Sequence, residues 1–82
     1  MNIEDIELEN VERIERQLIE KHGTLSASLT NSIKTIKTNL KLYSIDEELL
    51  NRVNEEMYEA GQEEDIKDVE TKIKHLSSTF WD

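Results

Sequence analysis

Few side chains in this sequence could carry out catalysis or bind a metal ion. The chain has two histidines, His22 and His75, and no cysteine, so a thiolate nucleophile and a cysteine metal site are excluded. Di-iron carboxylate bundles use a Glu-x-x-His motif, but Ile19 and Lys72 stand three residues before the histidines. The two glycines lie far apart, so no glycine-rich phosphate loop exists. We expect a non-catalytic protein with no cofactor and no bound metal.

Carboxylates are the most abundant ionisable groups. Nineteen Asp and Glu residues against ten Lys and Arg give a net charge of −9, and many acids stand in clusters, at 46–48, 55–56 and 63–65. Acids at the start of a helix complement its dipole, and acids on its outer face are solvated. Alternatively, a stripe of carboxylates could imitate the phosphates of a nucleic acid. As predicted protein-binding residues we select Glu55, Glu56, Glu63 and Glu64.

The net charge also limits the partners that the chain can bind. A charge of −9 repels phosphate backbones and anionic membrane surfaces, so we expect neither direct nucleic-acid binding nor membrane binding. A protein with a basic surface is the natural electrostatic match. The sequence therefore favours another protein, or a second copy of this chain, as the partner.

The single Phe and the single Trp stand next to each other, at Phe80 and Trp81. In one interpretation, Phe80 closes the core and Trp81 covers the end of the molecule. In the other, the pair is an aromatic anchor for a partner, because Trp is enriched among the residues that dominate binding at interfaces. Both interpretations stay open, and both residues belong to the predicted protein-binding set.

These side chains must be positioned by helices, and the stretch 24–43 is the one against which we expect the others to pack. No acidic residue occurs between Lys21 and Ser44, and three lysines follow one flank of the stretch: Lys34, Lys37 and Lys41. The apolar residues recur at spacings of three and four, which places them on one helical face: Leu29, Ile33, Ile36, Leu40 and Tyr43. Ser, Thr and Asn fill most other positions, so this helix needs tertiary contacts to be stable.

The first helix is expected over 3–22, with an acidic outer surface. Most of its apolar residues, Ile19 included, lie within about 80° of Val11 on a helical wheel. Two pairs have the i,i+4 spacing of helical ion pairs: Glu9 with Arg13 and Glu12 with Arg16. Gly23 is a candidate left-handed cap at the end of this helix, and Thr24 or Ser26 a candidate cap for the next.

Two more helices are expected, at about 45–60 and 63–80. Ser44 and Glu47 have the spacing of a capping box, which favours a turn there over one continuous helix from 24 to 60. Gly61 is expected to separate the third helix from the fourth. The fourth has the most regular apolar pattern, typical of a coiled-coil seam: Ile66, Val69, Ile73, Leu76 and Phe80.

Together these patterns predict an all-α fold, an up-down bundle of three to four short amphipathic helices in a single domain over 1–82. No apolar run approaches the roughly 20 residues that cross a bilayer, and the N-terminal residues do not resemble a secretory signal. We therefore expect a cytoplasmic protein. Three apolar residues lie off the seams and would be exposed in a monomer or buried in a complex: Ile6, Leu42 and Tyr58.

The function that these features favour is that of a small acidic protein-binding module: an adaptor, an inhibitor or a subunit of a helical assembly. In this hypothesis the aromatic pair at 80–81 anchors a partner, while the acidic faces of the third and fourth helices attract a basic surface and so raise the association rate. The alternative is a nucleic-acid mimic that blocks the nucleic-acid-binding site of a target enzyme.

Overall fold

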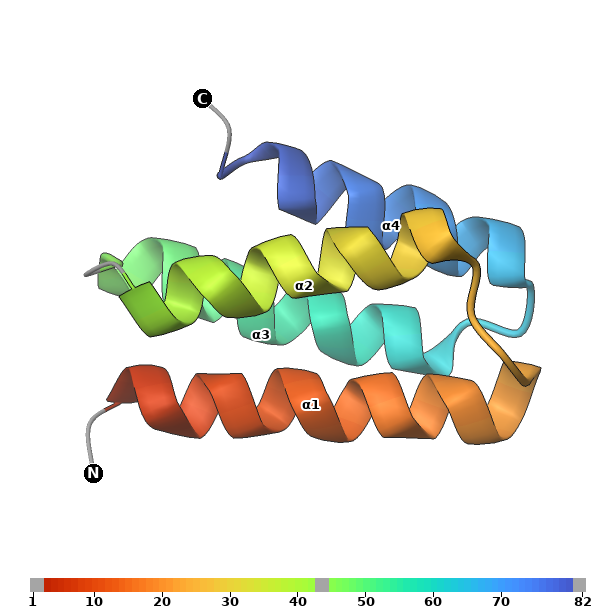
Figure 1. The fold of residues 1–82 in the computed structure, drawn as a ribbon. Helices are drawn as coiled ribbons and strands as arrows, with labels where there is room; N and C mark the ends of the chain where they lie inside the picture. The colour runs from red at the N-terminus through yellow and green to blue at the C-terminus, as the bar shows by residue number, and fades with distance from the viewer. Residues whose placement is uncertain (1–2, 43–44, 81–82) are drawn as a thin grey trace.

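The chain folds into α-helices that lie side by side. The computed structural model describes residues 3–42 and 45–80, and in these ranges the helices are α1 (Ile3–His22), α2 (Ala27–Leu42), α3 (Glu47–Gln62) and α4 (Ile66–Ser78). Successive helices run in opposite directions, and no strand occurs in the described ranges (Figure 1). The prediction of an all-α up-down bundle is confirmed, with four helices.

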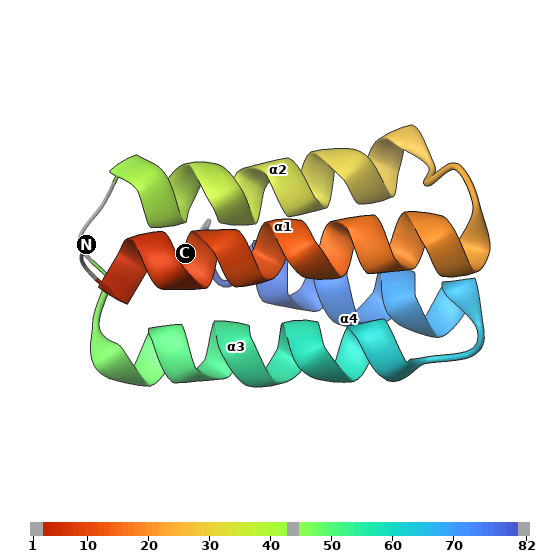
Figure 2. The same ribbon diagram turned by 90° about the horizontal axis from the view of Figure 1, so that it is seen from below.

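The helices occupy the corners of the bundle in an order that differs from their order in the chain. α1 packs against α2 and α3, and α4 packs against the same two helices. The consecutive helices α2 and α3 therefore lie diagonally opposite each other, with α1 and α4 between them (Figure 2). No helix is central in this arrangement. The lysine-bearing α2 occupies a corner beside the acidic α1, whereas the acids at 63–65 precede α4 and are not part of it.

The apolar stripe of α2 forms part of the core. Leu29, Ile33, Ile36 and Leu40 are buried, as predicted, while Tyr43 lies outside the described residues. They join one cluster with buried residues of the other three helices: Val11, Ile14, Leu18, Leu50, Val53, Met57, Ala60, Val69, Ile73 and Leu76. Burial of each Leu or Ile side chain contributes about 1.5–3 kcal/mol. These contacts offset the poor helix propensity of the Ser, Thr and Asn residues in α2.

The boundary between α1 and α2 follows its sequence signals. Gly23 has a φ of 85°, in the left-handed region that L side chains rarely adopt, and its N–H donates to the carbonyl oxygen of Ile19 at 2.8 Å. The cap of α2 is Ser26, because its Oγ accepts a hydrogen bond from the backbone N–H of Leu29 at 3.1 Å. The connection between these helices therefore spans 23–26, with Gly23 ending α1 and Ser26 capping α2.

Two aspartates cap the later helices. The carboxylate of Asp46 accepts a hydrogen bond from the backbone N–H of Leu49 at 2.8 Å, so the cap of α3 is Asp46 and not the predicted Ser44, which lies outside the described residues. In α4 the carboxylate of Asp65 accepts from the N–H of Lys67 at 2.9 Å. α2 ends before α3 begins, so the prediction of a turn rather than a continuous helix is confirmed.

The prediction that Gly61 separates α3 from α4 is wrong. Gly61 lies inside α3 and is buried, and the break follows at 63–65. A Cβ atom at this position would lie 3.1 Å from Oε1 of Gln17 and 3.4 Å from Cγ2 of Ile14, both on α1. The glycine therefore allows α1 and α3 to approach each other closely. The sequence alone does not distinguish a glycine with this packing role from one that ends a helix.

Three large apolar side chains are exposed among those that the structure describes. Leu42 and Tyr58 are 64% and 63% exposed, in agreement with their positions off the seams, whereas the side chain of Ile6 lies outside the described residues. Ile19 was expected on the buried face but is 47% exposed. Its place at the edge of the apolar arc explains the error, because the arc of α1 that contacts the core is narrower than the apolar pattern.

Candidate functional site

Among the predicted contact residues, Glu55 is the most available for a partner. It is exposed on the outer side of α3, and no ion pair of Glu55 occurs among the described residues. Glu56, one residue later, is half-buried, and its Oε2 lies 3.3 Å from Nε of Arg52 on the same helix. The two neighbouring carboxylates thus differ: one is free in solvent and the other is partly neutralised.

Glu63 and Glu64 lie where α3 gives way to α4, and both have lysines close by. Oε1 of Glu64, which is nearly fully exposed, lies 3.3 Å from Nζ of Lys21 on α1. Nζ of Lys72 on α4 lies 3.5 Å from Oε2 of Glu59 and 3.9 Å from Oε1 of Glu63. Exposed pairs of this kind contribute about 0–1 kcal/mol each, so these glutamates can still bind a partner.

Of the two adjacent aromatic residues, Phe80 belongs to the described part of the chain and Trp81 does not. Phe80 is partly buried and packs against the edge of the core, beyond the end of α4. Trp81 lies outside the described residues. The contact of Phe80 with the core agrees with the interpretation that this residue closes the core. Binding of a partner by Phe80 and Trp81 stays a prediction.

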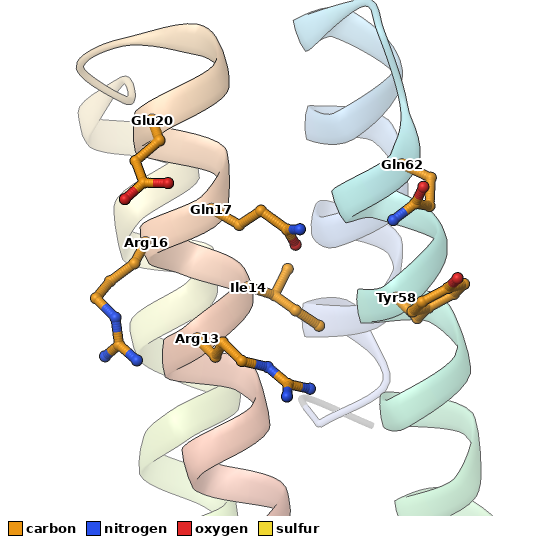
Figure 3. A pocket seen from close by; sticks show the side chains of 7 residues that line it. All are labelled: Arg13, Ile14, Arg16, Gln17, Glu20, Tyr58 and Gln62. Atoms are coloured by element: carbon orange, nitrogen blue, oxygen red, sulfur yellow. The ribbon is translucent and has the colours of Figure 1, made fainter.

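A groove lies on the surface between α1 and α3. Its volume is about 510 Å³, and it is lined by Arg13, Ile14, Arg16, Gln17, Glu20, Tyr58 and Gln62. Arg13 and Gln17 extend from α1 toward α3, while Arg16 and Glu20 lie on the opposite flank of α1 (Figure 3). Tyr58 and Gln62 lie across the groove on α3 (Figure 3). This groove was not predicted from the sequence, although Tyr58 was predicted to lie off the apolar face of its helix.

Two of the residues that line the groove are arginines, Arg13 and Arg16. Nη2 of Arg13 donates to Oδ1 of Asn10, a neutral amide, at 3.1 Å. Neither guanidinium forms an ion pair in the part of the chain that the structure describes, so the predicted pairs of Arg13 with Glu9 and of Arg16 with Glu12 are not formed. On a chain with a net charge of −9, this is a local cationic area.

The lysine flank of α2 faces α1 along a second, smaller depression of about 220 Å³, which Lys34, Lys37 and Lys41 line together with Glu12. Nζ of Lys37 lies 2.8 Å from Oε1 of Glu15, and both side chains are half-buried. The lysines therefore lie beside the carboxylates of α1. This ion pair connects the two helices that carry the strongest charges of opposite sign.

The histidines lie on diagonal helices and do not form a common site. His22 is half-buried at the end of α1, and His75 is exposed on α4, where its Nε2 lies 3.3 Å from Nη2 of Arg52. The described residues contain no group of three or more His, Asp or Glu side chains that could hold a metal ion.

Comparison of the chain with protein-family models, with curated proteins and with solved structures finds no match. In the described ranges, every helix is too short or too polar to traverse a lipid bilayer. Three features of the surface could bind a partner: the exposed acids of α3, the exposed Tyr58 and the groove beside it.

Proposed function

We propose that this chain is a small non-catalytic protein-binding module, which acts as an adaptor, an inhibitor or a subunit of a helical assembly. The observation that carries the proposal is Tyr58, which is 63% exposed on α3 beside a groove that also contains Arg13 and Arg16. Tyr and Arg are enriched among the residues that dominate binding energy at protein interfaces. A large aromatic ring held on a rigid helix also loses little conformational entropy when a partner covers it.

The partner in this proposal is a protein with a basic surface or a second copy of the chain. Glu48, Glu55 and Glu59 are exposed on α3, and the last two lie within one turn of Tyr58. Carboxylates around an aromatic contact attract a basic surface and raise the association rate, an effect that salt screens. Trp81 would add a second aromatic contact. No cofactor or metal takes part.

The test is affinity capture by the full chain from extracts of its native host, with mass spectrometry of the bound proteins. We compare the wild type with Tyr58→Ala and with Leu42→Ala, which removes an equally exposed apolar side chain from α2. A specific partner should bind the wild type and Leu42→Ala, and binding to Tyr58→Ala should fall at least about tenfold, the range of an interface residue that matters. Equal capture by all three proteins, with unchanged circular dichroism, would contradict the proposal.

The second candidate function is nucleic-acid mimicry, and the exposed acids of α3 favour it. Glu48 and Glu55 are two turns apart on the same side of the helix, about 10 Å along its axis. A target enzyme would then bind this surface in place of phosphates. In this case added DNA or RNA should displace the captured partner, and Glu48→Lys with Glu55→Lys should abolish capture. A partner that ignores the competitor removes this alternative.

A further inference from the structure

The geometry points to the groove between α1 and α3 as a docking site for a segment of a partner protein that presents a carboxylate next to an apolar or aromatic side chain. This inference rests on the proposed function and names the chemistry of the contact. Its three components are a guanidinium on one wall, an aromatic ring on the other and an apolar floor, contributed by Arg13, Tyr58 and Ile14 (Figure 3).

The charge of the groove selects the carboxylate. Arg13 is exposed, extends from α1 toward α3 and has a neutral amide of Asn10 as its described partner. A guanidinium binds a carboxylate through two parallel N–H donors, which is stronger than a hydrogen bond between neutral groups. Arg16 and Glu20 also line the depression but lie on the opposite flank of α1, so the charge between α1 and α3 is that of Arg13 (Figure 3). One carboxylate, and not a run of acids, matches this single charge.

The walls and floor select the neighbouring side chain. Ile14 is buried at the base of the groove, so an apolar group that enters meets aliphatic carbon rather than water. The ring of Tyr58 offers a flat apolar face, against which an aromatic or aliphatic side chain can stack. Contact of an apolar group with Ile14 and Tyr58 would remove apolar surface of this chain from water, which favours binding.

The remaining wall residues suit a peptide backbone. Gln17 and Gln62 lie on opposite helices, and each carboxamide offers both donors and an acceptor. Extended peptide exposes alternating N–H and C=O groups that such carboxamides can bind. Along α1 the groove runs from Arg13 to Gln17, about 6 Å, which is the length of roughly two extended residues.

Other occupants fit less well. A nucleic acid would bring many phosphates to a surface with one excess positive charge on a chain of net charge −9. A second copy of the chain also carries −9, and repulsion between the copies opposes its approach. A mostly neutral or basic protein with one acidic residue beside an apolar one avoids both penalties.

The experiment uses a short fluorescein-labelled glycine peptide that has one adjacent Asp–Trp pair in its centre and a lysine at each end. Fluorescence anisotropy with the full chain gives the dissociation constant. Amide NMR spectra of the labelled protein locate the binding site. Two further peptides serve as probes, one with Asn in place of Asp and one with Ala in place of Trp.

Matched variants separate the groove from general charge and hydrophobicity. Arg13→Gln and Tyr58→Ala should each weaken peptide binding about tenfold, the loss expected for a charge-assisted contact or an aromatic anchor. Lys34→Gln removes the same charge from α2, and Leu42→Ala removes a similar apolar area from the end of α2. These two controls should change the affinity less than about twofold. Amide shifts should concentrate at 13–20 and 58–62.

Three results would overturn the inference. The first is that the wild type binds the Asp–Trp peptide no better than the Asn or Ala probe. The second is that Arg13→Gln and Lys34→Gln weaken binding equally. The third is that sedimentation shows a dimer that Tyr58→Ala dissociates, because the groove would then be an interface between copies. Peptide failure with intact, Tyr58-dependent capture of a host protein would leave the proposed function standing.

Discussion

Two side chains bury a polar atom that has no hydrogen-bond partner in the described part of the chain: Oε2 of Glu7 and Nε2 of His22. Glu7 lies on the inward side of α1, where burial raises the pKa of its carboxyl group above the ordinary value of 4.5, against the smaller opposing effect of a hydrogen bond with Asn10. The folded protein therefore binds this proton more tightly than the unfolded chain does. Stability must fall as the pH rises through the raised pKa of Glu7.

Replacement of this carboxyl group by a neutral amide, in Glu7→Gln, should raise the thermal midpoint at pH 7. The gain should shrink as the pH falls from 7 through the raised pKa of Glu7 and should be gone below about 4.5, because the wild-type carboxyl is then protonated in both the folded and unfolded states. Thermal unfolding at several pH values measures the difference. Glu9→Gln removes the same charge from an exposed position of α1. An equal gain in both variants at pH 7 would mean that net charge, and not burial of Glu7, is the cause.

The contact between α1 and α2 is where helices of opposite charge meet. The Lys37–Glu15 pair, at 2.8 Å, is the ion pair whose two side chains are best shielded from solvent among the described residues. Shielding strengthens the attraction and also makes loss of one partner costly. The apolar stripe of α2 holds the helix in the core, and this pair helps to fix the rotation of α2 against α1.

Lys37→Glu should lower the free energy of unfolding by about 1–2 kcal/mol at low ionic strength, since it places two carboxylates side by side. The loss should be smaller in 1 M salt, where the screening length is about 3 Å. Urea unfolding at low and high NaCl concentration measures both values. Lys34→Glu makes the same change of net charge without breaking a described ion pair, and should cost less. Equal losses at both salt concentrations would argue against charge complementarity between the helices.

The diagonal placement of α2 and α3 is a property of the whole molecule. Both helices contact α1 and α4, so two faces of the bundle pair consecutive helices and the other two pair α1 with α3 and α2 with α4. The groove between α1 and α3 depends on this order, because α1 and α3 run parallel and lie side by side (Figure 1). In a bundle that followed the chain order around its corners, α1 and α3 would be diagonal, and Arg13 and Tyr58 would not share a groove.

Cross-linking tests this order directly, because the chain contains no cysteine of its own. Arg13→Cys with Tyr58→Cys places two thiols across the α1–α3 groove, and a short bis-maleimide should join them within one molecule. Thr38→Cys with Glu55→Cys places them on the outer sides of the diagonal helices α2 and α3. This pair should not react with the same reagent. Mass spectrometry of dilute samples measures both reactions, and the opposite pattern would contradict the helix order.

Much of the secondary structure could be predicted from local patterns. The stripe at Leu29, Ile33, Ile36 and Leu40 has helical spacing, and a helix with such a stripe must bury it wherever it packs. Gly23 ends α1 because a left-handed residue is a local requirement of the chain. Local signals misled where two residues competed, as Ser44 and Asp46 did for the cap of α3. The positions of the helices follow from these local features, whereas their number was predicted only as three to four.

The candidate site could not be predicted in the same way, because it depends on which helices are neighbours. Amphipathic patterns state that a face is buried but do not state against which helix, and four similar stripes can be arranged around a core in more than one order. Glycine in a sequence usually predicts a helix break, but Gly61 instead lies inside α3 where this helix packs closely against α1. Amphipathic spacing thus determined the helices and their shared apolar core, whereas the order of the corners, and with it the meeting of Arg13 and Tyr58, was decided by tertiary contacts between distant residues.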